Sequence, residues 1–132
     1  MTCRSNYDIT TLSDVVIIFR KGVDWLISSD VMRGYNELMI LYLLLERDSY
    51  GYEISRRIKE ISNEKYVMKE TTLYSAFTRL EKAGYMESYF GSETNGKQRT
   101  YYKITQAGIN YYNEKREEWK LVKEVVEKFI KR

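Results

Sequence analysis

Hydroxyl side chains and cations are concentrated in the segment Lys69–Arg79 of this 132-residue chain. Short hydroxyl side chains can approach base edges and phosphate oxygens closely, and Lys or Arg can neutralise phosphate charge. Backbone N–H groups near Thr71–Leu73, at the start of a helix, would also favour a phosphate. We predict that one face of the segment contacts DNA, through Lys69, Thr71, Thr72, Tyr74, Ser75, Thr78 and Arg79. Taken alone, the segment is explained better as an ordinary amphipathic helix with a solvated polar face than as a DNA-binding surface. Glu70 and Glu81 also reduce the positive charge of this region.

A second candidate group lies just after the dipeptide Asn95–Gly96, which is typical of a hairpin turn. Lys97 and Arg99 are two residues apart, so a strand would place both on one face, and Tyr101 continues that face. A basic pair at a hairpin tip suits phosphate contacts. The alternative is a charged edge strand whose role is to prevent aggregation.

The residue types that most enzymes need are scarce in this chain. It contains no histidine and one cysteine, Cys3. These counts exclude His-dependent nucleophile arrangements, imidazole metal sites and all-cysteine clusters. The acidic residues alternate with Lys and Arg as solvated helix pairs do, so no carboxylate pair suggests acid–base catalysis. We therefore expect no enzyme, no cofactor and no metal.

The formal net charge of +3 is unevenly distributed. Residues 63–132 hold 14 of the 22 Lys and Arg and 10 of the 19 acidic residues, so the positive excess lies in the C-terminal half. The longest apolar runs, Val15–Phe19 and Leu38–Leu45, are far shorter than the roughly 20 residues of a membrane span. We expect no membrane association and a cytoplasmic location, since paired cysteines are also lacking.

Three helices are predicted between residues 31 and 83. The first runs from Val31 to Glu46 after the cap candidates Ser28–Asp30. The second covers Gly51–Ser62, with Asp48 or Ser49 as its cap and Tyr52, Ile54, Ile58 and Ile61 inward. The third covers Thr72–Ala83, ends at Gly84, and carries a helical apolar stripe of Leu73, Ala76, Phe77 and Leu80.

After Gly84 the apolar period changes to about two, which predicts strands over 85–90 and 98–104. A final helix is expected from Gln106 to Lys131, capped by Thr105. Three short helices followed by a basic hairpin indicate a winged helix-turn-helix in a mainly α (α+β) chain with a long C-terminal dimerisation helix. The rival reading is a winged-helix adaptor that binds proteins and not DNA.

The last predicted helix carries apolar and aromatic residues at spacings of 7, 3, 4 and 3: Tyr112, Trp119, Val122, Val126 and Phe129. This seam favours self-association into a two-fold dimer, with partial packing on the first helix of the same chain as the alternative. Trp119 could serve as an interface anchor or as the wall of an apolar ligand pocket.

These elements divide the chain into three parts. We assign residues 1–25 to an N-terminal extension with little order, which contains a short β-branched run at 15–19. Residues 26–104 form the DNA-binding domain, and residues 105–132 form the dimerisation helix.

Several motifs, taken in this order, resemble the PadR family of bacterial transcriptional regulators, short-tailed subgroup. The carrying stretches are Ile27–Asp30 with Arg33–Gly34, Asp48–Ile54, Thr72–Tyr74, Arg79–Tyr85 and Gln98–Gly108. The resemblance implies a homodimeric winged-helix repressor that binds a pseudo-palindromic operator and is often released by a small aromatic or drug-like molecule.

The resemblance also implies roles for individual residues. By this resemblance, Thr72 and Tyr74 are expected to contact DNA. Arg79, Lys97 and Arg99 are expected to contact phosphates. Trp119 is expected to line an aromatic ligand pocket at the dimer interface. Gln98 and Thr100 occupy positions where relatives often carry basic residues, so we expect the hairpin to bind DNA more weakly.

Overall fold

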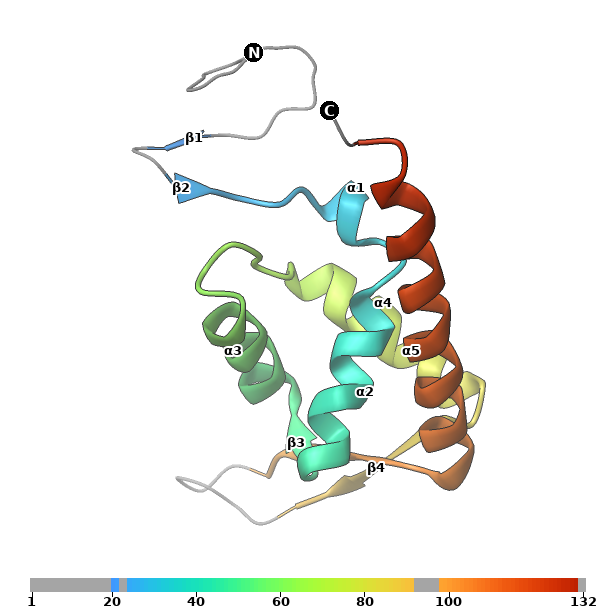
Figure 1. Ribbon diagram of the computed structural model, residues 1–132. Helices are drawn as coiled ribbons and strands as arrows, with labels where there is room; N and C mark the ends of the chain where they lie inside the picture. The colour runs from blue at the N-terminus through green and yellow to red at the C-terminus, as the bar shows by residue number, and fades with distance from the viewer. Residues whose placement is uncertain (1–19, 22–23, 92–97, 131–132) are drawn as a thin grey trace.

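The fold is a group of helices resting on a small three-stranded sheet, with a separate pair of short strands before the first helix (Figure 1). The structure is a computed structural model that describes residues 20–21, 24–91 and 98–130. In chain order the elements are β1 Arg20–Lys21, β2 Asp24–Trp25, α1 Ser29–Met32, α2 Asn36–Glu46, β3 Ser49–Tyr50, α3 Gly51–Ile61, α4 Glu70–Lys82, β4 Met86–Phe90, β5 Thr100–Ile104 and α5 Gln106–Glu127. Helices α3, α4 and α5 surround α2, and the sheet of β3, β5 and β4 closes one end (Figure 1).

The predicted first helix is in fact two helices, α1 and α2, separated by a turn at residues 33–35. Ser28 caps α1 as expected, since its hydroxyl accepts a hydrogen bond from the Val31 N–H. The break follows Gly34, a residue that disfavours helix. It lets Asn36 start α2 while buried, with its side-chain oxygen accepting a 2.7 Å hydrogen bond from the Tyr66 hydroxyl. The start of α2 therefore coincides with a contact to a residue 30 positions away in the chain.

Helix α3 confirms the second predicted helix, but its cap and part of its inward face were predicted wrongly. Tyr50 occupies the cap position without a side-chain cap, because Ser49 and Tyr50 form β3 against β5. Ile54 and Ile58 are buried, whereas Tyr52 is 70% exposed and Ile61 is also exposed. Tyr52 lies two residues before Ile54, about 200° around a helix, so it points away from the core.

The apolar stripe of α4 forms the centre of the core, as predicted. Leu73, Ala76, Phe77 and Leu80 are all buried. The Phe77 ring lies 4.3 Å, centroid to centroid, from the buried ring of Tyr102 on β5. Gly84 follows the α4 C-cap with φ of +81°, a left-handed conformation that ends helices and suits glycine. The stripe leaves the opposite side of α4 free of core contacts.

Two predicted strands pair antiparallel as the wing, in a register that joins Met86 to Ile104 and Phe90 to Thr100. The sequence did not reveal the third strand, β3, which pairs with the other edge of β5. The predicted turn at Asn95–Gly96 lies outside the described residues, as does Lys97. Most of the predicted 1–25 extension, including the 15–19 run, is outside them too.

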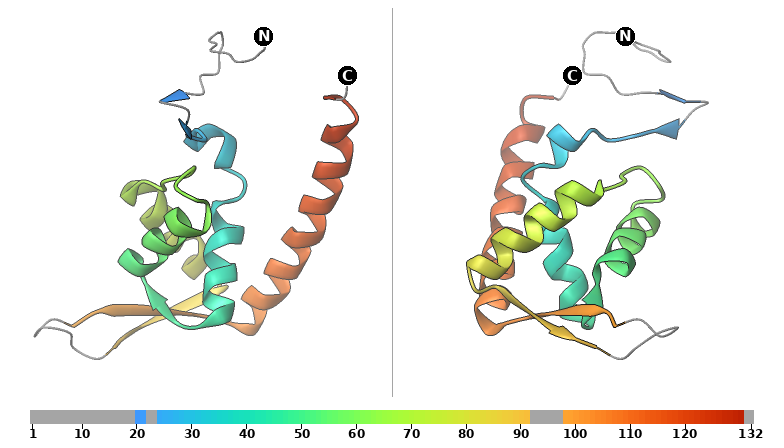
Figure 2. Two further views of the ribbon diagram at one scale, coloured as in Figure 1. Left: turned by 60° about the vertical axis from the view of Figure 1, so that its left-hand side comes forward. Right: turned by 180° about the vertical axis from the view of Figure 1, so that it is seen from behind.

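Helix α5 begins at the predicted cap. The Thr105 hydroxyl accepts a hydrogen bond from the Gly108 N–H at 3.0 Å and donates one to the Gly84 carbonyl at 2.7 Å. The first half of α5 packs on α2, which confirms part of the intramolecular packing considered for it. The second half leans away from the other helices towards the C-terminus (Figure 2).

Candidate nucleic-acid interface

Helix α4 turns its hydroxyl groups outward. Thr71, Ser75 and Thr78 are exposed on the side opposite the buried stripe, and Thr72 is half-buried on the flank. The Thr78 hydroxyl donates a 3.0 Å hydrogen bond to the Tyr74 carbonyl within the helix. That bond leaves the oxygen of Thr78 free to accept from an outside donor. The predicted polar face therefore exists as one continuous surface.

Lys69 stands at the start of this surface. It is the N-cap residue of α4, its side chain is exposed, and it makes no side-chain cap. The α4 N-terminus therefore has a cation beside its first N–H groups, an arrangement that favours phosphate.

Tyr74 links α4 to the first turn of α3. Its ring packs edge-on against Phe77 at 5.3 Å between centroids, and its hydroxyl lies against Gly51. A Cβ at Gly51 would overlap that hydroxyl, so the glycine creates the space for the tyrosine. The Tyr74 side chain is still 45% exposed, which leaves one edge of it on the surface.

Tyr52 is a candidate that the sequence reasoning missed. It projects from the first turn of α3, the element on which the Tyr74 hydroxyl rests. The sequence did contain a signal for this residue: Tyr52 is offset by about 200° around the helix from Ile54, so the two side chains cannot both face the core. An exposed tyrosine at a helix N-terminus can donate to a phosphate oxygen.

Arg79 is not a free cation. Its Nε donates a 2.7 Å hydrogen bond to the Glu37 carboxylate on α2, and Nη1 donates a weaker one, 3.3 Å long, to Ser75. A groove of about 680 Å³ runs along this flank between α2, α4 and α5. Its lining includes Arg33, Glu37, Thr72, Ser75, Arg79, Tyr111 and Lys115.

The wing residues form an aromatic ladder across the sheet. The Tyr101 ring lies between Tyr50, 5.4 Å away, and Tyr89, 5.8 Å away, measured between centroids. The guanidinium carbon of Arg99 sits 4.2 Å from the centre of the Tyr50 ring. Such a cation–π contact orients a guanidinium while leaving N–H groups for a phosphate.

An aspartate fixes the outer end of the ladder. The Tyr89 hydroxyl donates a 2.6 Å hydrogen bond to Asp48, just before β3. This bond, followed by burial and the nearby Asp48 charge, raises the pKa of Tyr89 above its ordinary value. Tyr89 therefore remains a neutral donor at physiological pH, and β4 stays tied to the α2–β3 connection.

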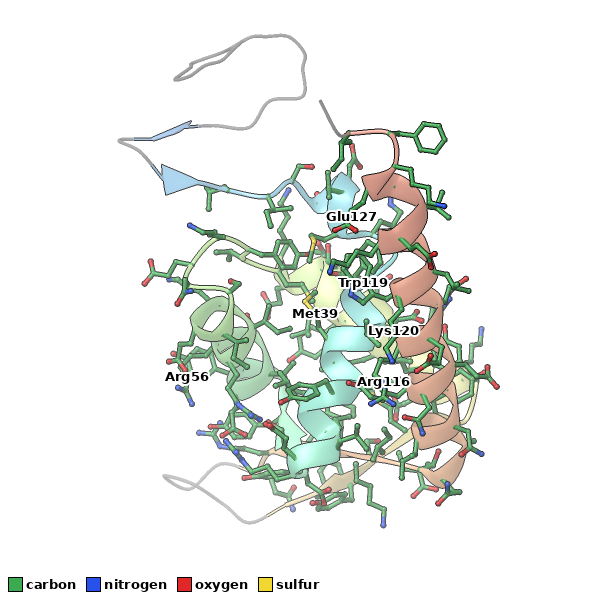
Figure 3. All side chains as sticks on the ribbon, in the orientation of Figure 1. Met39, Arg56, Arg116, Trp119, Lys120 and Glu127 are labelled. Atoms are coloured by element: carbon green, nitrogen blue, oxygen red, sulfur yellow. The ribbon has the colours of Figure 1, made fainter. Side chains whose placement is uncertain are left out.

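The predicted seam residues differ in exposure, and Phe129 lies beyond α5, which ends at Glu127 and not at the predicted Lys131. Tyr112 and Val122 are half-buried, and Trp119, Val126 and Phe129 are exposed, Phe129 to 82%. Trp119 lies midway along α5 (Figure 3), with its ring edge-on to Tyr35 at 5.4 Å between centroids. The two aromatic residues line a groove of about 400 Å³ together with Val31, Gly34, Leu38, Lys115, Glu118 and Val122.

Residues 40–114 match the sequence profile of the transcriptional regulator PadR-like family. The matched stretch is more than half of the chain, and it contains α3, α4 and the wing strands. The chain belongs to the PadR-like family. The resemblance seen in the sequence motifs is thereby confirmed.

The similarity of this PadR-like chain to known proteins extends over most of its length. A protein named "Uncharacterized protein X" from Lysinibacillus sphaericus is 44% identical over 105 residues, which are 80% of this chain and 96% of the relative. The solved structure of a transcriptional regulator from Clostridium thermocellum is 62% identical, with a TM-score of 0.74, and the match covers 78% of this chain and all of that one. A PadR family transcription regulator from Clostridium difficile is 32% identical, with a TM-score of 0.65, over 74% of this chain and 99% of that one.

These matches confirm the winged helix-turn-helix class and make the PadR-like chain a DNA-binding regulator of transcription, not an enzyme. Among the described residues no three His, Cys, Asp or Glu side chains are grouped as a metal site would require. None of the described helices is long and apolar enough to cross a membrane. The individual DNA contacts stay predictions, and Lys97 is the one predicted contact outside the described residues.

Proposed function

We propose that the chain is a homodimeric repressor that binds a pseudo-palindromic operator. The observation that carries the proposal is the exposed hydroxyl face of α4, with Thr71, Ser75 and Thr78 directed away from the core. In a winged helix-turn-helix this helix enters the major groove. A face of short hydroxyl side chains, free of core contacts, is suited to that position because it can approach both base edges and phosphate oxygens closely.

Affinity and specificity come from different parts of the surface in this proposal. Lys69, Arg79, Lys97 and Arg99 bind phosphates and supply most of the affinity, while Thr72, Tyr74 and Ser75 read the sequence. Thr71, Thr78 and Tyr101 position the protein on the backbone. This division follows from chemistry, because phosphate contacts carry no sequence information and base-edge contacts do.

The apolar seam of α5 supports the homodimer. Val126, near the end of α5, and Phe129, just beyond it, are exposed where the helix leans away from its own domain (Figure 2). A second copy related by a two-fold axis would cover this seam and present two α4 helices to DNA. Half-sites should then lie about one helical turn apart, roughly 34–36 Å, or a multiple of it.

The aromatic groove beside Trp119 is the proposed place for an effector. Trp119 is 41% exposed and faces Tyr35, and the remaining lining combines aliphatic side chains with Lys115 and Glu118. Flat aromatic ligands bind such surfaces by stacking and by burial of apolar area. A ligand there would contact both α5 and the α1–α2 turn.

A gel-shift titration over several salt concentrations, with promoter DNA of the protein's own operon, tests the proposal. We expect binding at low salt that weakens steeply as the salt concentration rises. Each bound operator should hold two protomers and therefore two α4 helices. No binding at low salt would contradict the proposal and favour the protein-interaction adaptor. Immunoprecipitation of the protein with its bound DNA, followed by sequencing, would then identify the operator.

A further inference from the structure

We infer that Glu37 is a positioning residue that holds Arg79 of the recognition helix, limits the charge that Arg79 offers to DNA, and connects it to α5. The inference rests on the proposed DNA-binding function of α4. It adds a residue of α2, outside the predicted interface, that controls how strongly the interface attracts phosphate.

Both oxygens of the Glu37 carboxylate are engaged by other elements. Oε2 accepts the 2.7 Å hydrogen bond from Arg79 Nε on α4, and Oε1 accepts a 3.1 Å hydrogen bond from the Tyr111 hydroxyl on α5. Glu37 is 42 residues from Arg79 and 74 from Tyr111 in the chain. Its side chain is only 23% exposed, so this carboxylate is less screened by water than those of the more exposed ion pairs on α5.

The geometry leaves part of the Arg79 guanidinium available. Of its five N–H donors, one on Nε is used by Glu37 and one on Nη1 by Ser75. The donors that remain are all on the two terminal nitrogens, and the side chain is 55% exposed. A phosphate could therefore bind at the terminal edge while Glu37 holds the other edge.

The nearby carboxylate opposes such a phosphate. A phosphate at the terminal edge would lie on the order of 6 Å from the Glu37 charge, where like charges repel in water and repel more strongly at a partly buried site. Arg79 in this pair therefore contributes less than a whole charge to DNA binding. Removing the charge while keeping an acceptor should make Arg79 more attractive to phosphate.

Tyr111 extends the arrangement to the dimerisation helix. Burial, followed by the Glu37 charge, raises the pKa of the Tyr111 hydroxyl, so it stays a neutral donor at physiological pH. Lys115, one turn further along α5, lies 5.7 Å from the centre of the Tyr111 ring and lines the same groove. A shift of α5 would move Tyr111 and change the support that Glu37 receives.

The test compares Glu37→Gln, Arg79→Ala and the double variant in binding to random-sequence duplex DNA over a range of salt. Glu37→Gln should bind several-fold more tightly at low salt, with the slope of log K against log salt steeper by up to about one unit. In the Arg79→Ala background the same substitution should have no such effect. Glu124→Gln on α5 removes an exposed charge far along the helix and controls for net charge.

Tyr111→Phe separates the two partners of Glu37. It removes the hydroxyl but leaves the carboxylate and Arg79, so the salt slope should change much less than it does in Glu37→Gln. Unchanged or weaker binding by Glu37→Gln, or an equal gain in the Arg79→Ala background, would overturn the inference. Wild-type protein that binds no DNA would instead refute the proposed function and, with it, the premise of the inference.

A direct measurement covers the case in which Glu37→Gln folds poorly. Nitrogen-15 spectra of the wild-type protein should show the Arg79 Nε–H exchanging with water more slowly than that of Arg56, whose partner Glu60 accepts from Nη1 instead. Equal exchange of the two would show that Glu37 does not hold Arg79 in solution. Thermal melts of every variant establish that it is folded.

Discussion

At the scale of single residues, the two arginines of the interface that the structure describes already have partners. Arg79 is paired with Glu37, and Arg99 lies over the Tyr50 ring. Partly exposed contacts of this kind stabilise a protein by about 1 kcal/mol or less, so a phosphate can compete for either cation. The structure therefore shows oriented cations whose release or sharing costs little.

Arg99→Ala tests the wing at this scale. Binding to every DNA sequence should weaken, and the salt slope should become shallower by about one unit, because one phosphate contact is lost. Arg99→Lys keeps the charge and should retain most of the slope. A loss confined to one base position in an operator would contradict a phosphate role.

Gly108→Ala tests a close contact on which the position of α5 depends. A Cβ at Gly108 would overlap the backbone carbonyl of Tyr85, so either the helix start or the α4–β4 connection must shift. We expect a loss of about 2–4 kcal/mol in the free energy of unfolding, measured with urea. Gly34→Ala is the matched control, because its added Cβ would meet no atom within 4 Å, and its stability should stay close to the wild-type value.

At the scale of elements, the core positions α4 and thereby its polar face. The buried stripe of α4 meets Tyr102 on the wing strand β5, and Tyr74 rests on Gly51 at the start of α3. The recognition helix is thus fixed between the wing and the preceding helix. Its outward hydroxyl groups have one defined orientation relative to the sheet.

Ser75→Ala tests whether this orientation is used to read sequence. Ser75 is exposed on α4, so the substitution should alter the operator preference in a selection from random DNA while stability changes by less than about 0.5 kcal/mol. Thr72→Ala should also alter preference. A uniform loss of affinity with an unchanged selected sequence would show that these hydroxyl groups contact only the backbone.

At the scale of the whole molecule, α5 has two different halves. Its first half begins at the Thr105 cap and packs on α2, whereas Val126 near its end and Phe129 just beyond it are exposed. An exposed apolar seam on a helix that leans away from its domain is typical of an interface. The proposed dimer would bury this seam.

Val126→Glu tests the dimer. A carboxylate in the seam should shift sedimentation velocity from dimer to monomer and weaken binding to a two-half-site operator much more than to a single half-site. Lys120→Glu places a carboxylate on the polar side of α5 and should remain dimeric. Wild-type protein that sediments as a monomer at micromolar concentration would contradict the proposal.

The sequence alone determined the features that depend on local periodicity. The 3.6-residue stripe of Leu73, Ala76, Phe77 and Leu80, the stop at Gly84, the two-residue period of the wing and the Thr105 cap were all predicted, since each is encoded by neighbours within one or two turns. The family motifs lie in these same elements. Their order was enough to indicate a winged helix-turn-helix.

Tertiary structure decided everything that depends on contacts between distant segments. The α1–α2 break is associated with the bond between Asn36 and Tyr66, and β3 exists because β5 offers it a free edge. Glu37 meets Arg79 and Tyr111 only because α2, α4 and α5 pack together. Such contacts leave no periodic pattern in the chain, so the partners of the interface cations could be learned only from the folded molecule.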